Sequence, residues 1–292
     1  VYLGRGQEAV SASIGARLVQ GKDIFAPLIR DQAGRTAFGE EILDATRTYL
    51  GSVKGPMKAR DGNIHRGRPK EGVVAMISHL GSSLSVLGGM LKARQLQGKL
   101  DGCVGATCIG DGATSTGAFH EGLNYVAVEK LPVVVVVADN QFAYSTPNSK
   151  QYACDDLIDR AKGYGVAGHS VDGTDTLACA TVIGQAIDSA RNGAGPQMVV
   201  AKLLRLSGHG EHEDGSYMPE EIRASQYGRD CMDVGKQQLL ERGWLTEKEL
   251  ADWEEAAKQE VQLAVTTAQK EDEPDPYKED WCALARGSYR NW

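Results

Sequence analysis

Two short polar motifs combine residue types that could bind a cation and a phosphate. Gly110-Asp111-Gly112 follows one apolar run, and Asn140 follows the next, Leu131–Ala138. A right-handed crossover would place both motifs beyond the carboxyl ends of neighbouring parallel strands, where such sheets bind ligands. Carboxylate and amide oxygens suit Mg²⁺, the glycines allow close backbone approach, and the following helix would present free N–H groups to a phosphate. This arrangement predicts a site for a metal-bridged phosphate.

A nicotinamide dinucleotide site is the main alternative for the same glycine turn. Its fingerprint is G-x-G-x-x-G, whereas the turn here is G-x-G-x-x-x-x-G from Gly110 to Gly117. The acid after the second apolar run, Asp139, lies 29 residues beyond Gly110, where about 20 is expected. Asp111 would repel a bare pyrophosphate, but a bridging cation reverses that interaction. The residues therefore favour a metal-bridged diphosphate.

Helical and apolar segments alternate along the chain and predict the elements that position these motifs. Helices are predicted over 6–20, 82–96, 118–128, 157–163 and 176–191, and strands over 103–109, 132–138, 166–171 and 197–204. Continuous apolar runs, rather than alternating ones, are typical of strands buried on both faces. We expect an α/β fold with a mainly parallel sheet and helices on both faces.

The rest of the chain divides into a long loop and a helical C-terminal part. Residues 51–73 are rich in Gly, Lys, Arg and Pro, and a loop of that length inside a domain is more often functional than idle. From Pro219 onward only helical patterns follow, the last over 246–270. We predict an α/β domain over 1–218 and a C-terminal helical extension over 219–292. The acidic run Glu271–Glu273 is interpreted as a solvated face.

The composition excludes several classes of function. The 292 residues carry 32 Lys and Arg against 39 Asp and Glu, a formal net charge of −7, without a basic cluster, so we expect no nucleic-acid partner. The longest apolar run is far shorter than the roughly 20 residues of a membrane span, so we expect no membrane partner. The chain begins at Val1 and enters a helical pattern almost at once, so we expect a preceding segment, in which a targeting signal would not be visible.

The cysteines indicate a reducing compartment. They are Cys103, Cys108, Cys154, Cys179, Cys231 and Cys282, and no two of them form a C-x-x-C pair. Reduced, mostly buried thiols in a cytoplasmic location of the bacterial type fit this pattern.

The glycine turn and Asn140 together resemble the signature of thiamine-diphosphate enzymes. The segment from Gly110 to Ser115, followed by Phe119–Val128, looks like the corresponding segments in the alpha subunit of the decarboxylating component of 2-oxo acid dehydrogenase complexes. The resemblance spans nearly the whole chain and also includes Gly6–Ala9, Ser145–Pro147, Gln151-Tyr152, Val171–Gly173 and Gly243–Glu247. A short glycine motif alone would be weak evidence, but the ordered set is specific.

The resemblance implies residues for the cation and the diphosphate. Mg²⁺ would be held by Asp111, Asn140 and the backbone carbonyl of Phe142. The family usually has a tyrosine at this last position, but a carbonyl needs no particular side chain. Arg30 and Arg205 match the family's two diphosphate-binding arginines, and guanidinium groups suit phosphate oxygens.

The resemblance also implies residues around the rest of the cofactor. Ser78 and Leu80 match positions that contact the aminopyrimidine ring, and His209 matches the active-site histidine. Histidine suits proton handling near neutral pH. The remaining members of the expected set are Gly110, Gly112 and Ala113 in the glycine turn, and His65, which lies where related sequences have a loop histidine.

Several positions depart from the family's pattern. Ile29 stands where a tyrosine usually precedes the first arginine, and the turn after that arginine is one residue longer than usual. After His209 the family commonly reads Ser-x-x-Asp, but Gly210 excludes a phosphoserine there. Tyr217 is followed by Met218 instead of arginine, so we expect this loop to lack its anchoring arginine. These changes keep a catalytically degenerate structural or regulatory paralogue as an alternative.

The activity that the resemblance implies is oxidative decarboxylation of a 2-oxo acid with thiamine diphosphate and Mg²⁺, followed by acyl transfer to a lipoyl group on a partner acyltransferase. The family's activating glutamate comes from a separate beta subunit, and no candidate for it stands out here, so we expect an α₂β₂ heterotetramer. Ser145–Pro147 and Gln151-Tyr152 resemble branched-chain enzymes more than pyruvate enzymes. Acetoin-cleaving dehydrogenase subunits share the same scaffold and are a further alternative.

The other histidines have simpler interpretations. His120 and His169 fit surface or packing positions. His209 and His212, with the glutamates beside them, could suggest a zinc site, but no third ligand group has suitable spacing.

Overall fold

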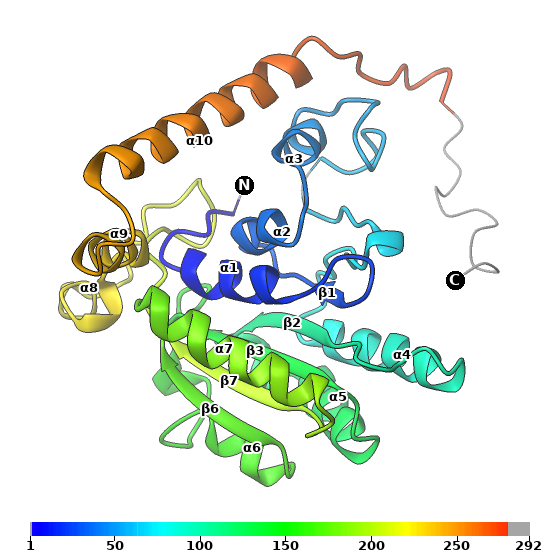
Figure 1. Ribbon diagram of the computed structural model, residues 1–292, viewed down its shortest axis with the longest axis vertical. Coiled ribbons are helices and arrows are strands. Elements are labelled where there is room, and N and C mark those ends of the chain that lie inside the picture. The colour runs from blue at the N-terminus through cyan, green and yellow to red at the C-terminus, as the bar shows by residue number, and fades with distance from the viewer. Residues whose placement is uncertain (1, 63, 280–292) are drawn as a thin grey trace.

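A five-stranded parallel sheet forms the centre of the computed structural model, which describes residues 2–62 and 64–279 (Figure 1). Its strand order is β1-β2-β3-β7-β6. The strands are β1 (Ile24–Ala26), β2 (Gly105–Gly110), β3 (Val133–Asp139), β6 (Ala167–Asp172) and β7 (Gln197–Lys202). A separate antiparallel pair, β4 (Phe142–Ala143) and β5 (Thr146–Pro147), follows β3 directly.

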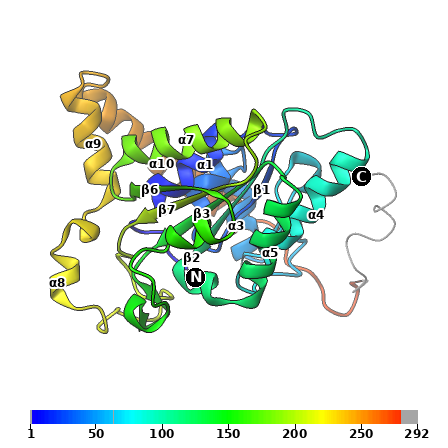
Figure 2. The ribbon, with the colours of Figure 1, turned by 90° about the horizontal axis from the view of Figure 1, so that it is seen from below.

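Helices cover both faces of this sheet, as predicted (Figure 2). They are α1 (Glu8–Arg17), α2 (Gln32–Ala37), α3 (Ile42–Tyr49), α4 (Ser82–Leu96), α5 (Gly117–Val128), α6 (Asp159–Gly163), α7 (Thr176–Arg191), α8 (Glu220–Arg223), α9 (Cys231–Glu241) and α10 (Glu247–Ala268). Short 3-10 helices are η1 (Pro69–Glu71), η2 (Asp111–Ser115), η3 (Asn148–Lys150) and η4 (Gln226–Gly228). The predicted fold class is confirmed.

The valine run of β3 shows why this sequence forms a central strand. All seven β3 residues are buried. Val134, Val136 and Ala138 join the core under α1 and α7. Val133, Val135 and Val137 join the core under α4 and α5. Because successive side chains of a strand point to opposite faces, a strand covered on both sides needs apolar residues at every position.

β1, α2 and α3, which precede the loop 51–73, were not predicted from the sequence. β1 has only three residues, all buried, so it offers no pattern to recognise. α2 is six residues long and contains Gly34. A Cβ on Gly34 would lie 2.5 Å from the carbonyl oxygen of Ser11, so the glycine permits α2 to pack directly against α1. Packing therefore decides this helix despite glycine's poor helix propensity.

β6 departs from the expectation of strands buried on both faces. It lies at the edge of the sheet, where Ala167, Gly168 and Ser170 are exposed and Val171 is buried. An edge strand needs apolar residues only where a neighbouring element covers it.

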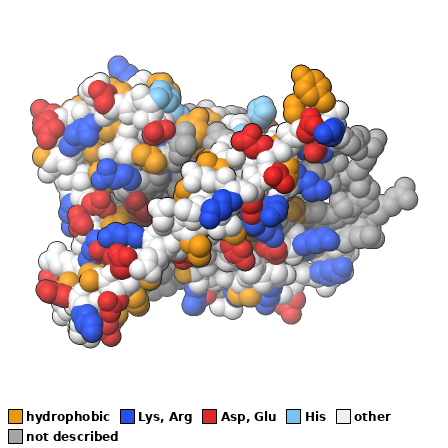
Figure 3. All heavy atoms as spheres, turned by 90° about the horizontal axis from the view of Figure 1, so that it is seen from above, with side chains coloured by type: hydrophobic (Ala, Val, Ile, Leu, Met, Phe, Trp, Pro, Cys, Tyr) orange, Lys and Arg blue, Asp and Glu red, His pale blue; other side chains and the backbone are white. Residues whose placement is uncertain are grey.

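The C-terminal part is helical over α8 to α10, and α10 begins with a capping box between Thr246 and Glu249. Acidic and basic side chains are interspersed over the face that Figure 3 shows.

The interpretation of the acidic run as a solvated face is wrong for Glu271, whose side chain is only 6% exposed. Its carboxylate binds the Arg47 guanidinium at 2.6 and 2.9 Å and accepts a hydrogen bond from Ser52 at 2.5 Å. This contact joins the chain after α10 to α3.

Two further expectations concern thiols and membranes. Among the described residues, five cysteines are free and all except Cys154 are buried, whereas Cys282 lies outside the described residues. No described helix combines the length and apolar character that a membrane crossing requires. The boundary predicted at residue 218 stays a prediction, and residues 280–292 of the predicted extension lie outside the described part.

Candidate functional site

The carboxyl ends of β2 and β3 bring the two polar motifs together. The two strands are parallel neighbours, and Gly110 pairs with Ala138 at their ends. Asp111 and Asn140 therefore leave the sheet at the same edge. The glycine turn itself forms η2, and α5 begins only after it. The predicted crossover geometry is thus confirmed.

A cavity of about 590 Å³ opens at this edge, and every residue that the sequence analysis assigned to the cofactor or the cation lies on its wall. These residues are Arg30, Ser78, Leu80, Gly110, Asp111, Gly112, Ala113, Asn140, Phe142, Arg205 and His209. His65 lies on the same wall. Segments far apart in the sequence therefore form one site.

Asp111 is buried at the base of this cavity, with 1% of its surface exposed. Its Oδ2 accepts a hydrogen bond from Nε2 of Gln151 at 2.9 Å. Burial raises the pKa of Asp111 to about 6; the Gln151 hydrogen bond opposes this rise, and the nearby charge of Asp139 adds to it. Ionised carboxylates are costly in such surroundings unless a cation neutralises them. Asp111 is therefore suited to bind a metal ion.

Asn140 and Phe142 supply the other two predicted ligand groups. The Asn140 amide donates from Nδ2 to Oε1 of Gln7 at 2.8 Å, and its Oδ1 accepts the Phe142 N–H at 3.4 Å. The carbonyl oxygen of Phe142 lies 3.4 Å from Nη1 of Arg205. The phenyl ring of Phe142 packs edge-on against Tyr217, with 5.7 Å between ring centroids. This apolar packing explains why the position can lack a tyrosine hydroxyl.

Arg30 and Arg205 are both buried in the cavity wall, with 5% and 1% of their surface exposed. Arg30 donates to the carbonyl oxygens of Leu3 at 2.9 Å and His209 at 2.7 Å. Arg205 donates to the carbonyl oxygen of Tyr144 at 2.8 Å. Neutral carbonyl groups thus hold both guanidinium groups in place, including that of Arg30, despite the altered sequence around it.

These two arginines differ from the other buried arginines in their charge balance. Arg35 and Arg66 both pair with the carboxylate of Glu40. Within residues 2–62 and 64–279, neither Arg30 nor Arg205 forms an ion pair with a carboxylate. Burial and the neighbouring charge of Arg205 lower the pKa of Arg30 to about 10. Glu213 acts on Arg30 only through its charge, and two buried positive charges that no carboxylate of the described chain pairs with directly favour an anionic ligand.

His209 faces the same cavity between two tyrosine rings. Its ring centroid lies 4.5 Å from that of Tyr144 and 5.4 Å from that of Tyr2. Nδ1 of His209 is buried and has no hydrogen-bond partner in the described chain. Burial, with the charges of Arg30 and Arg205, lowers the pKa of His209 to about 4. The imidazole is therefore neutral at pH 7 and can accept a proton or a hydrogen bond.

A hydrogen-bonded chain links the long loop to the rim of the cavity. His65 bonds through Nδ1 to Asp61 Oδ2 at 2.8 Å and through Nε2 to Ser78 Oγ at 2.5 Å. Since the carboxylate accepts the Nδ1 proton, Nε2 is left to accept the Ser78 proton. Leu80 is exposed farther along the rim. The prediction that the loop 51–73 contributes to the site is therefore supported by this contact.

The glycines of the turn have different steric roles. A Cβ on Gly110 would meet no atom within 4 Å, so this position borders open space. A Cβ on Gly112 would lie 2.5 Å from Cβ of Ala143, so this glycine allows the β4 hairpin to pack against η2. Ala113 lines the same wall.

Sequence analysis assigned no role to several residues that shape the site. Tyr2 and Tyr144 contact His209, and Met76 completes the wall beside Ser78. Gln7 and Gln151 hold the two predicted ligand side chains from outside the cavity. Their only signal was membership of the motifs that carry the family resemblance.

The arginine that the family has after Tyr217 is absent, because Met218 takes its place. Arg223, at the end of α8, donates from Nη2 to the carbonyl oxygen of Gly215 at 2.8 Å. Met218 is buried nearby. An arginine from a different position therefore holds this loop.

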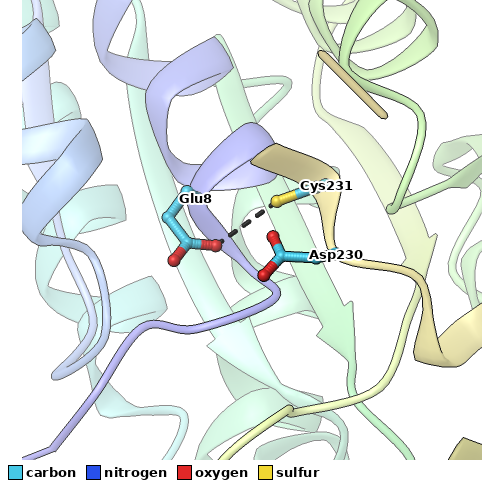
Figure 4. A group of neighbouring side chains, drawn as sticks. All are labelled: Glu8, Asp230 and Cys231. Carbon is cyan, nitrogen blue, oxygen red and sulfur yellow. Dashed lines mark hydrogen bonds between the residues drawn. The ribbon is translucent and has the colours of Figure 1, made fainter. Parts of the chain in front are cut away.

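One other cluster brings metal-ligating residue types together in the described chain, where α1 meets α9 (Figure 4). It consists of Glu8, Asp230 and Cys231, whose ligand atoms lie within 4.8 Å of one another. The Cys231 thiol donates to Glu8 at 3.3 Å, and burial raises its pKa to about 12. This hydrogen bond joins the start of α9 to α1. The histidine and glutamate group around His209 forms no such cluster among the described residues.

The cavity as a whole fits an anion bridged to a divalent cation. Asp111, Asn140 and Phe142 offer oxygen groups on its wall, and the guanidinium groups of Arg30 and Arg205 provide positive charge. Hard cations such as Mg²⁺ prefer oxygen ligands and usually share them with phosphate groups. The residues present therefore suit both Mg²⁺ and a diphosphate.

Comparison with known proteins agrees with this geometry. The chain is 31% identical over 280 residues to the alpha subunit of acetoin:2,6-dichlorophenolindophenol oxidoreductase from Cupriavidus necator, covering 94% of this chain and 82% of that protein. It is 30% identical over 282 residues to the 2-oxoisovalerate dehydrogenase subunit alpha of Bacillus subtilis, covering 96% and 84%. It is 27% identical over 271 residues to the pyruvate dehydrogenase E1 component subunit alpha of Rhizobium meliloti, covering 92% and 77%. The family model of the dehydrogenase E1 component matches residues 1–277, and the chain therefore belongs to this family, as its sequence motifs indicated.

Proposed function

We propose that this chain is the alpha subunit of an enzyme that oxidatively decarboxylates a 2-oxo acid with thiamine diphosphate and Mg²⁺. One observation carries the proposal: the buried carboxylate of Asp111 and the amide of Asn140 share a cavity with the guanidinium groups of Arg30 and Arg205. Family membership supports the same cofactor chemistry.

Each group has a distinct task in this proposal. Arg30 and Arg205 bind the diphosphate oxygens, while Asp111, Asn140 and the Phe142 carbonyl hold Mg²⁺. Thiamine diphosphate held there would supply a nucleophilic carbon and a sink for the electron pair that remains when carbon dioxide leaves the substrate. The protein's contribution is to orient this cofactor and to exclude water from it.

His209 and the rim residues act on the remaining part of the cofactor and on the substrate. Neutral His209 can hold a proton at Nδ1, the buried nitrogen that has no partner within the described chain. Ser78 and Leu80 line the cavity and are proposed to contact the aminopyrimidine ring. Because Ser78 donates its own proton to His65, its oxygen can accept a hydrogen bond from that ring.

A second subunit is required by the same proposal. Asp111 is the only carboxylate on the wall of the cavity in the described chain, and it is committed to the cation. The carboxylate that activates the aminopyrimidine ring must then come from a beta subunit, in an α₂β₂ heterotetramer. The alpha-subunit designation of the three relatives supports this assembly. A lipoyl acyltransferase would receive the acyl group.

The substrate is proposed to be a branched-chain 2-oxo acid or pyruvate, with acetoin as the second candidate. The relatives' names include 2-oxoisovalerate, pyruvate and acetoin, with similar levels of identity. The Ser145–Pro147 and Gln151-Tyr152 segments favour the branched-chain acids. These segments adjoin the β4–β5 hairpin at the cavity.

The test is a substrate panel on the chain co-expressed with its beta-type subunit. Pyruvate, branched-chain 2-oxo acids and acetoin are supplied with thiamine diphosphate and Mg²⁺, and reduction of 2,6-dichlorophenolindophenol is recorded. We expect turnover that requires both subunits, both cofactors and Arg205, with Arg17→Lys as the control for an exposed arginine. Robust turnover by this chain alone would refute the shared site. Failure of the complex to bind thiamine diphosphate would instead identify a degenerate paralogue.

A further inference from the structure

Gln7 contacts a predicted cation ligand although it does not line the cavity. It lies directly before α1, and only 1% of its surface is exposed. Its Oε1 accepts the hydrogen bond from Asn140 Nδ2 at 2.8 Å. The other end of the Asn140 amide, Oδ1, is turned toward the Phe142 N–H at 3.4 Å. The Phe142 N–H and Gln7 Oε1 together favour the amide orientation in which Oδ1 lies away from Gln7, while Nε2 of Gln7 is buried and has no hydrogen-bond partner within the described chain.

Gln151 makes the equivalent contact with the other ligand side chain. Its Nε2 donates to Asp111 Oδ2 at 2.9 Å and to the carbonyl oxygen of Thr146 at 2.9 Å. Gln151 thus holds one carboxylate oxygen of Asp111, and backbone N–H groups of Asp111 and Gly112 also bond to this carboxylate. The carbonyl contact ties Gln151 to β5, so the glutamine is itself held in place.

We infer that Gln7 and Gln151 are positioning residues that orient Asn140 and Asp111 for binding a divalent cation. The inference rests on the proposed function, and it assigns roles to two side chains outside the cavity wall. An asparagine can present either oxygen or nitrogen to a cation, and only the oxygen binds. A buried glutamine oxygen opposite Nδ2 favours the orientation in which the Asn140 oxygen is available to the cation, and water cannot easily replace it at a site so little exposed.

The effect on cation affinity follows from the general behaviour of such contacts. Loss of a hydrogen-bonding partner behind a metal ligand typically weakens metal affinity by about 10–100-fold. We expect Gln7→Met to weaken Mn²⁺ binding within this range, because methionine has similar length but no acceptor for Asn140 Nδ2. Gln7→Glu retains an oxygen at that place and should keep the affinity within a few-fold of the original chain. Gln151→Met should weaken Mn²⁺ binding as Gln7→Met does.

The experiment measures Mn²⁺ binding by electron paramagnetic resonance in the presence of thiamine diphosphate, on the full chain co-expressed with its beta-type subunit. Gln197→Met is the matched control, because Gln197 is also a buried glutamine and bonds to His169 away from the cavity. Thermal unfolding without cation reports whether each variant folds. If Gln7→Met does not fold, Gln151→Met tests the inference at the other ligand.

The outcomes separate this inference from the proposed function. Weaker Mn²⁺ binding in the two methionine variants, with affinity retained in Gln7→Glu and Gln197→Met, supports the positioning role. Equal affinity in folded Gln7→Met, Gln151→Met and the unmodified chain overturns it. Absence of Mn²⁺ and thiamine diphosphate binding in the unmodified complex contradicts the proposed function itself.

Discussion

The guanidinium group of Arg30 donates a hydrogen bond to the backbone carbonyl of His209 at 2.7 Å. This contact joins the segment before α2 to the loop that follows β7. It also places a positive charge beside the imidazole, and this charge helps to keep the pKa of His209 low. Whatever neutralises the arginines will therefore also change the titration of the histidine.

We expect ligand binding to raise the pKa of His209. Burial is the larger cause of its depression to about 4, and Arg30 and Arg205 add to it. The negative charge of a bound diphosphate offsets both arginines, so the imidazolium becomes easier to form. Nuclear magnetic resonance titration of the histidine ring, with and without thiamine diphosphate and Mg²⁺, measures this change. The resonances of His169, outside the cavity, serve as the control and should not respond to the ligand.

Asp111→Asn should stabilise the ligand-free chain while removing cation binding. The folded-state pKa of about 6 lies above the ordinary 3.8, so the ionised carboxylate destabilises the fold. The penalty is fully present above pH 6 and disappears as the pH falls below 3.8. At pH 7 it corresponds to up to about 3 kcal/mol. Urea unfolding at pH 7 and pH 4 measures the gain, and calorimetry with Mg²⁺ and thiamine diphosphate measures the loss.

An unchanged or lower stability of Asp111→Asn at pH 7 would show that this carboxylate carries no such strain. Asp188→Asn is the control, because Asp188 lies on the surface beside Arg17. It should leave the cofactor affinity unchanged.

The two glycines of the turn should respond oppositely to alanine. Gly110→Ala adds a methyl group that meets no protein atom within 4 Å, so stability should change by less than about 0.5 kcal/mol. The methyl group enters the space available to the ligand, so cofactor affinity should fall. Gly112→Ala places a methyl group 2.5 Å from Cβ of Ala143 and should cost about 1–3 kcal/mol. Thermal unfolding combined with cofactor titration distinguishes the two effects, and the reverse order of stabilities would contradict this geometry.

Glu271→Gln should loosen the chain after α10 from α3. Hydrogen bonds from Arg47 and Ser52 lower the pKa of Glu271 to about 2. Because this pKa is depressed, the stabilisation is present above the ordinary value of 4.5 and is lost as the pH falls toward 2. We expect a loss of about 1–2 kcal/mol at pH 7, measured by urea unfolding. Glu273→Gln, at an exposed position, should cause no loss.

The position of the polar motifs could be predicted because it depends on local patterns. The valine run of β3 needs no distant information to indicate a strand buried on both faces. Strand direction then places Asp111 and Asn140 at one edge. The family resemblance added Arg30 and Arg205 to the predicted site, because hydrophobic periodicity does not indicate phosphate-binding residues. Glu271 was misinterpreted because its partner Arg47 lies 224 residues earlier, and no local pattern indicates such a contact.

By itself the sequence determined strands β2, β3, β6 and β7, the longer helices that cover them and the residue types at the carboxyl ends of β2 and β3, since these follow from neighbours along the chain. Only the tertiary structure decided which distant side chains hold the residues of the site in place. Gln7 reaches Asn140 and Arg30 reaches the loop of His209 across more than a hundred residues. Such contacts arise from helix packing on the sheet, where direction and distance depend on the whole core rather than on any local spacing.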